Sequence, residues 1–307
     1  MPTSNPSSSS MAATRALAGP GQDDWHFPKE SPRRSQLAAE RIETVRASLA
    51  SCELCAHRCR VNRLKGPAGL CHAGATARVF SAQLEVGDEL ELVPAFAVAL
   101  SGCNLRCGFC ISGEQSWQAK AGVGLDATGI AAQACLALDR GAQSVLLLGG
   151  EPAIHLPSVL AIVTALPDTA RLVWKTNGFS SALARSWMEN LFDVWVVDYK
   201  FGRDDCARRL ARVSDYTAVV RENLLWARDH SELIVRHLLL PGHLDCCWRP
   251  VAAWLAGNLP GVKVSLRAGY WPAWQAQRFS ELGRAVTVRE QEAAAAIAGE
   301  HRLRLIP

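Results

Sequence analysis

The chain has 307 residues, of which 49% are hydrophobic, and its formal net charge is +4. Such a composition can bury a sizeable core, and so small a charge does not indicate a nucleic-acid partner. No apolar run reaches the roughly 18 residues that span a bilayer, and no secretory signal precedes the cysteines. We therefore expect a cytoplasmic protein that binds neither nucleic acid nor membrane. Its 11 cysteines are an odd number and fall in clusters, which favours metal binding over disulfide pairing.

The N-terminal part of the chain divides into a tail and a small cysteine-rich region. Residues 1–36 are rich in Ser, Pro and charged side chains, so we expect a disordered tail, with Met11 as an alternative start. Residues 37–50 have the spacing of an amphipathic helix, and residues 51–76 bring four cysteines among Gly and Pro. A segment so poor in core-forming residues usually needs a staple. We therefore assign residues 37–92 to a helix and a metal-binding region.

Residues 93–307 alternate short apolar runs with amphipathic stretches. That alternation predicts a parallel α/β sheet covered by helices, with ligands at the carboxyl ends of its strands. Six units are too few for a closed eight-stranded barrel, so either a partial (βα)6 TIM-like barrel or a doubly wound sheet fits. The predicted strands are 95–101, 143–148, 171–176, 193–199, 233–239 and 262–267, and the predicted helices lie near 127–139, 157–165, 181–190, 215–229 and 246–257.

The segment SGCNLRCGFC directly follows the first predicted strand and carries Cys103, Cys107 and Cys110. Three thiolates on one short loop can converge on a soft metal centre. Structural zinc normally takes a fourth protein ligand, and none follows nearby, although a zinc loop is the alternative. A four-iron cluster held by only three cysteines keeps one iron open to another ligand. Phe109 is expected to shield one side of that cluster.

Polar residues follow the next two predicted strands. In the segment GGEP, Gly149 and Gly150 permit close backbone approach, and Glu151 offers a carboxylate that suits an ammonium group. The segment KTNG then places Asn177 after the third strand. Because the carboxyl ends of parallel strands meet at one edge of the sheet, we expect these residues to lie near the cysteine loop.

Charged residues mark the fourth and fifth strands. Asp198 and Lys200 of the segment DYK point the same way, because side chains alternate along a strand. The alternative for Lys200 is a solvated strand end. Arg236 lies inside an apolar strand, where an unpaired charge is costly, so we expect it to face the site.

In their order and spacing these motifs resemble the radical SAM superfamily. The resemblance implies a partial barrel of the radical SAM type, a [4Fe-4S] cluster on the three cysteines, and S-adenosyl-L-methionine (SAM) at the open iron. It implies reductive cleavage of SAM to a 5′-deoxyadenosyl radical that abstracts a hydrogen atom, with electrons from a flavodoxin- or ferredoxin-type donor. The catalytic residues it implies are Lys200 and Arg236, and the cofactor-binding residues are Phe109, Gly149, Gly150, Glu151, Asn177, Asp198, Lys200 and Arg236.

A narrower resemblance is to the activating enzymes of glycyl-radical enzymes, above all a branch named after the pyruvate formate-lyase activating enzyme. It runs from about residue 50 onward and is carried by CELCAHRCRVNRLKGPAGLCHAG, SGCNLRCGFC, GGEP, VVDYKFG, VRHLLLPGH and VSLRAGYWP. It implies a protein substrate, such as a glycyl-radical enzyme, with a small molecule as the alternative. The chain departs from that pattern at Lys175, where an acidic residue is usual, at Ile111, where the branch has Gln, and at Gly269-Tyr270-Trp271, where a histidine is expected.

A second cysteine group, in the N-terminal region, has the spacing C-x2-C-x3-C-x11-C and comprises Cys52, Cys55, Cys59 and Cys71. Four soft ligands within so short a segment can hold zinc or a second iron–sulfur cluster. The C-x2-C-x3-C part favours the cluster, and the alternative to any metal is a loop of free thiols.

The remaining cysteines, Cys135, Cys206, Cys246 and Cys247, are interpreted as structural. Cys135 lies in an Ala/Leu helix, where a free cysteine behaves as a small hydrophobic residue. Cys246 and Cys247 are adjacent, and adjacent residues rarely both reach one metal.

The sequence is compatible with two functions: a radical SAM enzyme, or a non-catalytic iron–sulfur or zinc protein that carries electrons or serves as a scaffold. The second has no use for GGEP, Lys200 or Arg236, so their ordered presence favours the enzyme.

Overall fold

The computed structural model describes residues 32–87 and 89–307, and residues 33–307 form one compact unit. Residues 1–31, with most of the predicted tail and the alternative start Met11, lie outside the described residues. The first helix, α1, spans Arg34–Ser48 and so begins three residues earlier than predicted. In the described part of the chain, no helix is long and apolar enough to cross a membrane.

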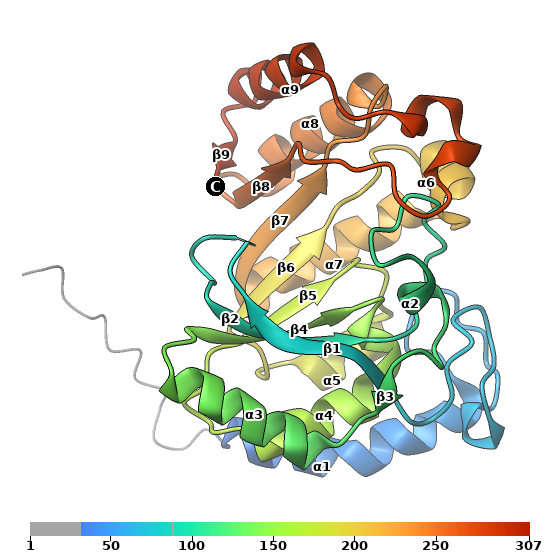
Figure 1. Cartoon of the computed structure of the whole chain (residues 1–307), viewed down its shortest axis with the longest axis vertical. Coiled ribbons are helices and arrows are strands. Elements are labelled where there is room, and N and C mark those ends of the chain that lie inside the picture. The colour runs from blue at the N-terminus through green and yellow to red at the C-terminus, as the bar shows by residue number, and fades with distance from the viewer. Residues whose placement is uncertain (1–31, 88) are drawn as a thin grey trace, which may run out of the picture. The chain divides into compact units, whose positions relative to one another are not determined.

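The strands form one sheet in the order β3-β1-β2-β4-β5-β6-β7-β8-β9 (Figure 1). From β2 onward the strands are parallel and their spatial order follows the chain without reversal. A doubly wound sheet would reverse its strand order near the middle. Of the two folds that the sequence allowed, the strand order therefore excludes the doubly wound sheet and supports the partial barrel. The parallel strands are β2 (Ala95–Leu100), β4 (Ser144–Gly149), β5 (Leu172–Thr176), β6 (Val194–Asp198), β7 (Glu232–Leu238), β8 (Lys263–Arg267) and β9 (Arg304–Leu305).

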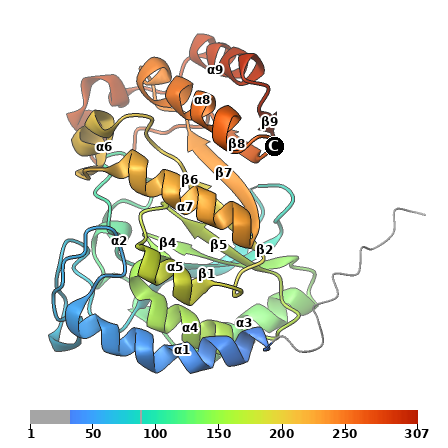
Figure 2. The same ribbon diagram turned by 180° about the vertical axis from the view of Figure 1, so that it is seen from behind.

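Helices cover the outer face of this curved sheet, and Figure 2 shows α4, α5, α7 and α8 in front of it. The N-terminal helix α1 packs along α4 in the same layer. Each predicted strand from 93 onward is present, with its ends displaced by at most one residue. The remaining helices are α2 (Gly113–Trp117), α3 (Ala127–Asp139), α4 (Leu156–Ala165), α5 (Ala182–Met188), α6 (Asp204–Ala211), α7 (Tyr216–His230), α8 (Arg249–Asn258) and α9 (Val288–Glu300).

Several elements were not predicted, among them the strands β1, β3 and β9 and the short helices α2 and α6. The strands β1 (Arg78–Glu85) and β3 (Val123–Gly124) extend the sheet in the antiparallel sense beside β2. They are largely exposed on one face, so they lack the continuous apolar run that marks the buried strands. The helix α6 is amphipathic, with Cys206, Ala207, Leu210 and Ala211 buried on one face, but it is only eight residues long, which is too short for a clear helical period.

The cysteine-rich region packs against the carboxyl end of β5. The backbone of Ala56 donates to the carbonyl of Phe179 over 3.2 Å, and Ser181 donates to the carbonyl of Leu54 over 3.2 Å. The loop after β5 therefore holds the region in place at the edge of the sheet where the predicted site residues lie.

Candidate active site

The cysteine loop leaves β2 through Gly102, whose φ of +89° is rare for a residue with a side chain. The loop is then anchored to α6. The amides of Arg106 and Gly108 donate to the carbonyls of Ala211 and Leu210, both over 2.9 Å. These backbone bonds fix the path of the loop independently of its cysteine side chains.

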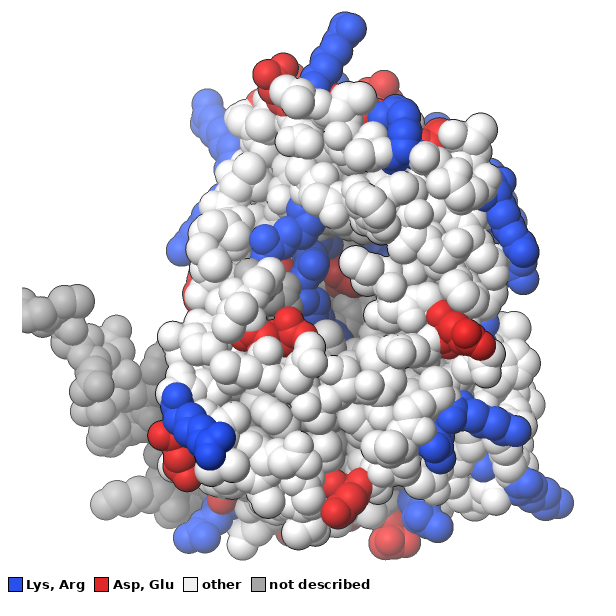
Figure 3. Space-filling model, in the orientation of Figure 1, with Lys and Arg blue, Asp and Glu red and all other residues white. Residues whose placement is uncertain are grey.

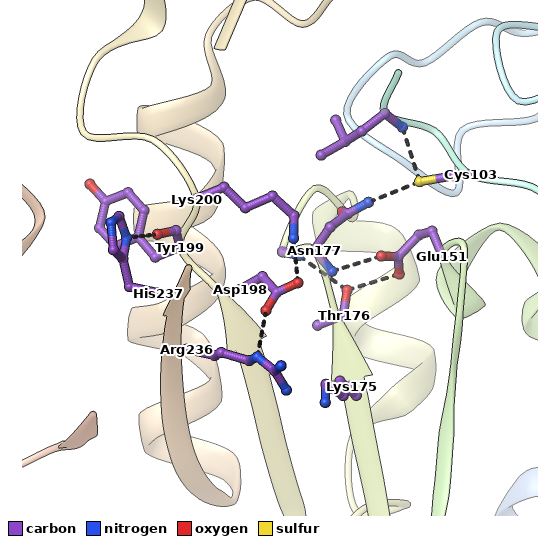
Figure 4. A network of polar contacts seen from close by, with 12 residues as sticks. Cys103, Glu151, Lys175, Thr176, Asn177, Asp198, Tyr199, Lys200, Arg236 and His237 are labelled. Atoms are coloured by element: carbon purple, nitrogen blue, oxygen red, sulfur yellow. Dashed lines mark hydrogen bonds and ion pairs between the residues drawn. The ribbon is translucent and has the colours of Figure 1, made fainter. Parts of the chain in front are cut away.

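Cys103 and Cys107 are buried, and Cys110 is half-buried. The sulfur of Cys103 accepts hydrogen bonds from the amide of Leu105 over 3.3 Å and from the side chain of Asn177 over 3.5 Å (Figure 4). Burial raises the pKa of the Cys107 thiol to about 12, and the ammonium group of Lys200 acts in the opposite direction. Donors and a cation aimed at these sulfurs suit thiolates that ligate iron, so the loop fits the cluster that its spacing predicts.

The glycine pair of GGEP lets the end of β4 approach the cysteine loop. A Cβ on Gly149 would lie 2.2 Å from the carbonyl oxygen of Leu100, and one on Gly150 would lie 2.0 Å from that of Gly102. The structure thus explains both glycines by backbone packing. Their contact with a cofactor stays a prediction.

Glu151 connects the ends of β4 and β5. Its buried carboxylate accepts hydrogen bonds from the amide of Ala153 over 3.0 Å, from the hydroxyl of Thr176 over 2.8 Å and from the amide of Asn177 over 2.8 Å. Burial raises its pKa to about 7, against the effect of these donors. Glu151 therefore positions the KTNG segment, and its predicted contact with an ammonium group stays a prediction.

Asp198, Lys200 and Arg236 lie together at the ends of β6 and β7, as Figure 4 shows. The ammonium nitrogen of Lys200 lies 2.5 Å from Asp198, and Nε of Arg236 lies 3.9 Å from the other oxygen. Burial alone would raise the pKa of Asp198, but Lys200 and Arg236 lower it below its usual value. The structure thus brings these three predicted side chains into one charged group.

A buried carboxylate that the sequence did not indicate lies inside the barrel. Glu89 is 0% exposed, and its oxygens lie 3.3 Å from Arg236, 3.3 Å from Arg267 and 3.7 Å from Lys175. The hydroxyl of Ser265 also donates to it over 2.9 Å. Lys175, which departs from the activating-enzyme pattern, is therefore an ion-pair partner of Glu89. Figure 3 shows a hollow in this face of the molecule with basic and acidic side chains inside it.

Phe109 is buried between aromatic side chains, with ring centroids 6.1 Å from Phe201 and 6.4 Å from Tyr270. Tyr270, in the segment where a histidine was expected, donates its hydroxyl to the carbonyl of Leu282 over 2.8 Å. Ile111, directly after the third cysteine, is 82% exposed. The aromatic wall beside the cysteine loop is thus apolar, and the loop surfaces at Ile111.

The N-terminal cysteines are gathered in one small region. Cys52, Cys55 and Cys71 are buried and Cys59 is half-buried. The guanidinium of the buried Arg63 lies 3.5 Å from the sulfur of Cys52. Metal binding by these cysteines stays a prediction.

The radical SAM superfamily model matches residues 98–255, which is about half of the chain and includes the cysteine loop, GGEP, Lys200 and Arg236. The chain belongs to the radical SAM superfamily. As a radical SAM protein it is an enzyme, and a [4Fe-4S] cluster and SAM are the cofactors of its superfamily. A relative, the uncharacterized protein MJ0674 of Methanocaldococcus jannaschii, is 29% identical over 297 residues, covering 92% of this chain and 85% of that one.

Solved structures similar to this radical SAM chain are more distant. SuiB of Streptococcus suis, bound to its precursor peptide SuiA, is 13% identical with a TM-score of 0.49, covering 67% of this chain and 46% of SuiB. TYW1 with a lysine-pyruvate adduct is 14% identical with a TM-score of 0.45, covering 66% and 73%. QueE of Escherichia coli is 13% identical with a TM-score of 0.39, covering 75% and 92%. The chain thus spans less than half the length of SuiB. TM-scores below 0.5 give no information about the function of this chain.

Proposed function

We propose that Cys103, Cys107 and Cys110 hold a [4Fe-4S] cluster and that SAM binds at its open iron. The observation that carries this proposal is the contact between Asn177 and the sulfur of Cys103, which brings the KTNG segment to the cysteine loop. When bound, the cluster and SAM supply a 5′-deoxyadenosyl radical that abstracts a hydrogen atom from the substrate.

The residues of the chain hold the reactants in place. Lys200 presents its ammonium group beside the cysteine loop and suits the carboxylate of SAM. Asp198 holds Lys200 and Arg236 in position through its two oxygens. We propose Lys200 and Arg236 as the catalytic pair, with Gly149, Gly150, Glu151, Asn177, Asp198 and Phe109 completing the cofactor site.

The formation of 5′-deoxyadenosine tests this function. Protein reconstituted anaerobically and supplied with a strong reductant should release 5′-deoxyadenosine and methionine from SAM. A variant with Cys103, Cys107 and Cys110 replaced by alanine should release none while keeping its circular dichroism spectrum. A folded wild-type protein that holds four irons yet leaves SAM intact would instead favour a non-catalytic iron–sulfur protein.

We propose further that the substrate carries an anionic group. Arg267, the last residue of β8, pairs with the buried Glu89 over 3.3 Å. The Nε of Arg267 is buried and makes no hydrogen bond within the part of the chain that the structure describes. A carboxylate or phosphate of the substrate would accept a charge-assisted hydrogen bond from this guanidinium.

Fractions of a cell extract can test this substrate class. Each fraction is added to the reconstituted enzyme, and the release of 5′-deoxyadenosine above the background without substrate is measured. Small molecules retained on an anion exchanger should stimulate it. Stimulation only by the neutral or cationic small molecules would contradict the proposal. Stimulation only by the macromolecular fraction would also contradict the proposal and would favour a protein substrate, such as a glycyl-radical enzyme.

The N-terminal cysteines are proposed to hold a second centre, for which an iron–sulfur cluster is preferred over zinc. The side chain of Arg106 supports this, because Cys103 and Cys71 both act to raise its pKa and its Nη2 donates to the carbonyl of Leu70. Arg106 thus links the cysteine loop to the N-terminal cysteine region, where a second cluster would relay electrons to the first from a flavodoxin- or ferredoxin-type donor. Two clusters predict about eight irons per chain.

The second centre is tested by metal analysis of a variant in which all four N-terminal cysteines are replaced by serine, namely Cys52, Cys55, Cys59 and Cys71. The variant should keep about four irons and lose the rest. Loss of one zinc with no loss of iron would make the centre a structural zinc site. No loss of either metal would show that Cys52, Cys55, Cys59 and Cys71 are not ligands.

A further inference from the structure

A second group of metal-ligating side chains lies between α6 and the segment that connects β7 to α8. It consists of Cys206 on α6, His243 after β7, and Cys246 and Cys247 in the turn before α8. The three sulfur atoms and a ring nitrogen of His243 all lie within 4.8 Å of one another. Among the residues that the structure describes, no other set of His, Cys, Asp or Glu meets as closely.

The local backbone explains how two adjacent cysteines reach one point. Residues Leu244–Trp248 form a π-helical turn, in which the amide of Trp248 donates to the carbonyl of His243 over 3.2 Å. This wider turn brings both sulfurs toward the same ring nitrogen, and such turns are frequent at functional sites. Cys206, Cys246 and Cys247 were interpreted from the sequence as structural, and adjacent cysteines were not expected to reach one metal. The structure brings all three sulfurs together with His243 through a π-turn, which has no signature in the sequence.

The distances suit a single tetrahedral ion. The Nδ1 of His243 lies 3.1 Å from the sulfur of Cys246 and 3.6 Å from that of Cys247, and the two sulfurs are 3.9 Å apart. A zinc ion with ordinary Zn–S bonds holds its sulfur ligands roughly 3.8 Å apart. Cys206, Cys247 and His243 are buried. Cys246 opens on a surface pocket of about 440 Å³, through which an ion can reach the ligands.

The imidazole is oriented as a ligand. Its Nε2 lies 3.4 Å from the carboxylate of Glu281 and 3.4 Å from a guanidinium nitrogen of Arg209, and these two side chains pair with each other over 2.5 Å. In the tautomer that donates its Nε2 proton to Glu281, the lone pair of Nδ1 is directed at the sulfurs. Carboxylates that fix a metal-binding histidine in this way recur at zinc sites. Packing alone gives no reason for this arrangement.

We propose that Cys206, His243, Cys246 and Cys247 bind one Zn²⁺ ion as a closed structural site. The ion would join α6 to the segment between β7 and α8, which is separated from α6 in the sequence by α7 and β7. Because α6 accepts the backbone hydrogen bonds of Arg106 and Gly108, the site supports the loop that carries Cys103, Cys107 and Cys110. The zinc content of the protein is measured independently of SAM cleavage. A failure of the zinc site can therefore be distinguished from a failure of the proposed function.

Zinc analysis of purified variants tests the site. The test variant replaces Cys206, Cys246 and Cys247 with serine, and the control replaces Cys135, which lies on α3, with serine. The test variant should contain one zinc fewer than wild type, whereas the control should lose none. Equal zinc in the test variant and the wild type would overturn the proposal, as would a disulfide among these three cysteines in unreduced wild-type protein.

Two further measurements guard against a test variant that does not fold. In wild-type protein, bound zinc should protect Cys206, Cys246 and Cys247 from alkylation until a chelator is added, whereas Cys135 should react at the same rate in both cases. The variant Glu281→Gln should fold and bind zinc 10- to 100-fold more weakly. Alkylation of all three thiols at unchanged rates with and without the chelator would contradict the site.

Discussion

The side-chain amide of Asn177 lies 3.5 Å from the sulfur of Cys103, so the third parallel strand, β5, reaches a cysteine on the loop that follows the first, β2. The same amide donates to the carbonyl oxygen of the Asn104 side chain over 2.7 Å, which fixes its orientation. Hydrogen bonds to the sulfurs of a cluster help to set its reduction potential.

Asn177→Ala should make the reduction potential of the cluster more negative, because the reduced cluster loses a donor that stabilises its added charge. A redox titration followed by electron paramagnetic resonance measures this. Asn223→Ala is the control, since it removes another buried amide, which bonds the carbonyl of Ser180 instead of a sulfur of the cysteine loop. The same shift in both variants, or none in either, would refute a direct effect of Asn177.

Lys200→Ala should weaken SAM binding roughly 10- to 100-fold, because a charge-assisted hydrogen bond contributes about 1.5–3 kcal/mol. Calorimetry on the reconstituted protein measures the dissociation constant. Lys263→Ala is a matched control, since Lys263 is also ion-paired and 20% exposed but lies at the start of β8. An unchanged dissociation constant in Lys200→Ala would show that Lys200 does not contact SAM.

Glu89→Gln should lower the free energy of unfolding by about 3 kcal/mol, because it removes the buried negative charge that pairs with Lys175, Arg236 and Arg267. Glu91→Gln should cost less than about 1 kcal/mol, since that carboxylate is 32% exposed and pairs with Lys263 near the surface. Urea denaturation of both variants measures the difference. If the two variants had the same free energy of unfolding, the buried carboxylate of Glu89 would not contribute more to stability than the exposed one of Glu91.

His155 should make the protein less stable in mild acid. Burial lowers its pKa to about 4, and the positive charge of Arg63 adds to that effect, while its Nε2 is bonded to the carbonyl of Ser101 over 2.7 Å. Because the folded pKa lies below the unfolded value of about 6.5, the contribution of His155 is complete above pH 6.5 and is lost as the pH falls toward 4. His155→Gln should therefore flatten the fall in unfolding free energy between these values. A variant with the same slope as wild type would contradict this role.

The alternation of apolar runs and amphipathic stretches sufficed to predict the parallel strands, because buried strands such as β2 have no polar residue in them. The cysteine loop and GGEP were predicted because their residues are close in sequence. The order of the strands in the sheet could not be predicted from the sequence. Only this order distinguishes a partial barrel from a doubly wound sheet.

Other features depend on contacts between distant segments and left no pattern to find. Glu89 lies in a turn that looks like ordinary surface, yet it ends inside the barrel among Lys175, Arg236 and Arg267. Cys206 meets Cys246 and Cys247 only because a π-turn follows His243. Each of these is a tertiary relationship, which local periodicity does not encode.

The proposed function requires that SAM binds directly to an iron held by Cys103, Cys107 and Cys110. Electron–nuclear double resonance on the reduced protein, with SAM labelled at its carboxylate oxygens and amino nitrogen, detects this bond. We expect hyperfine coupling of these labels to the cluster in wild-type protein and in the variant lacking the four N-terminal cysteines, and none when Cys103, Cys107 and Cys110 are replaced. A reduced cluster on those three cysteines with saturating SAM and no coupling to the labels would contradict it.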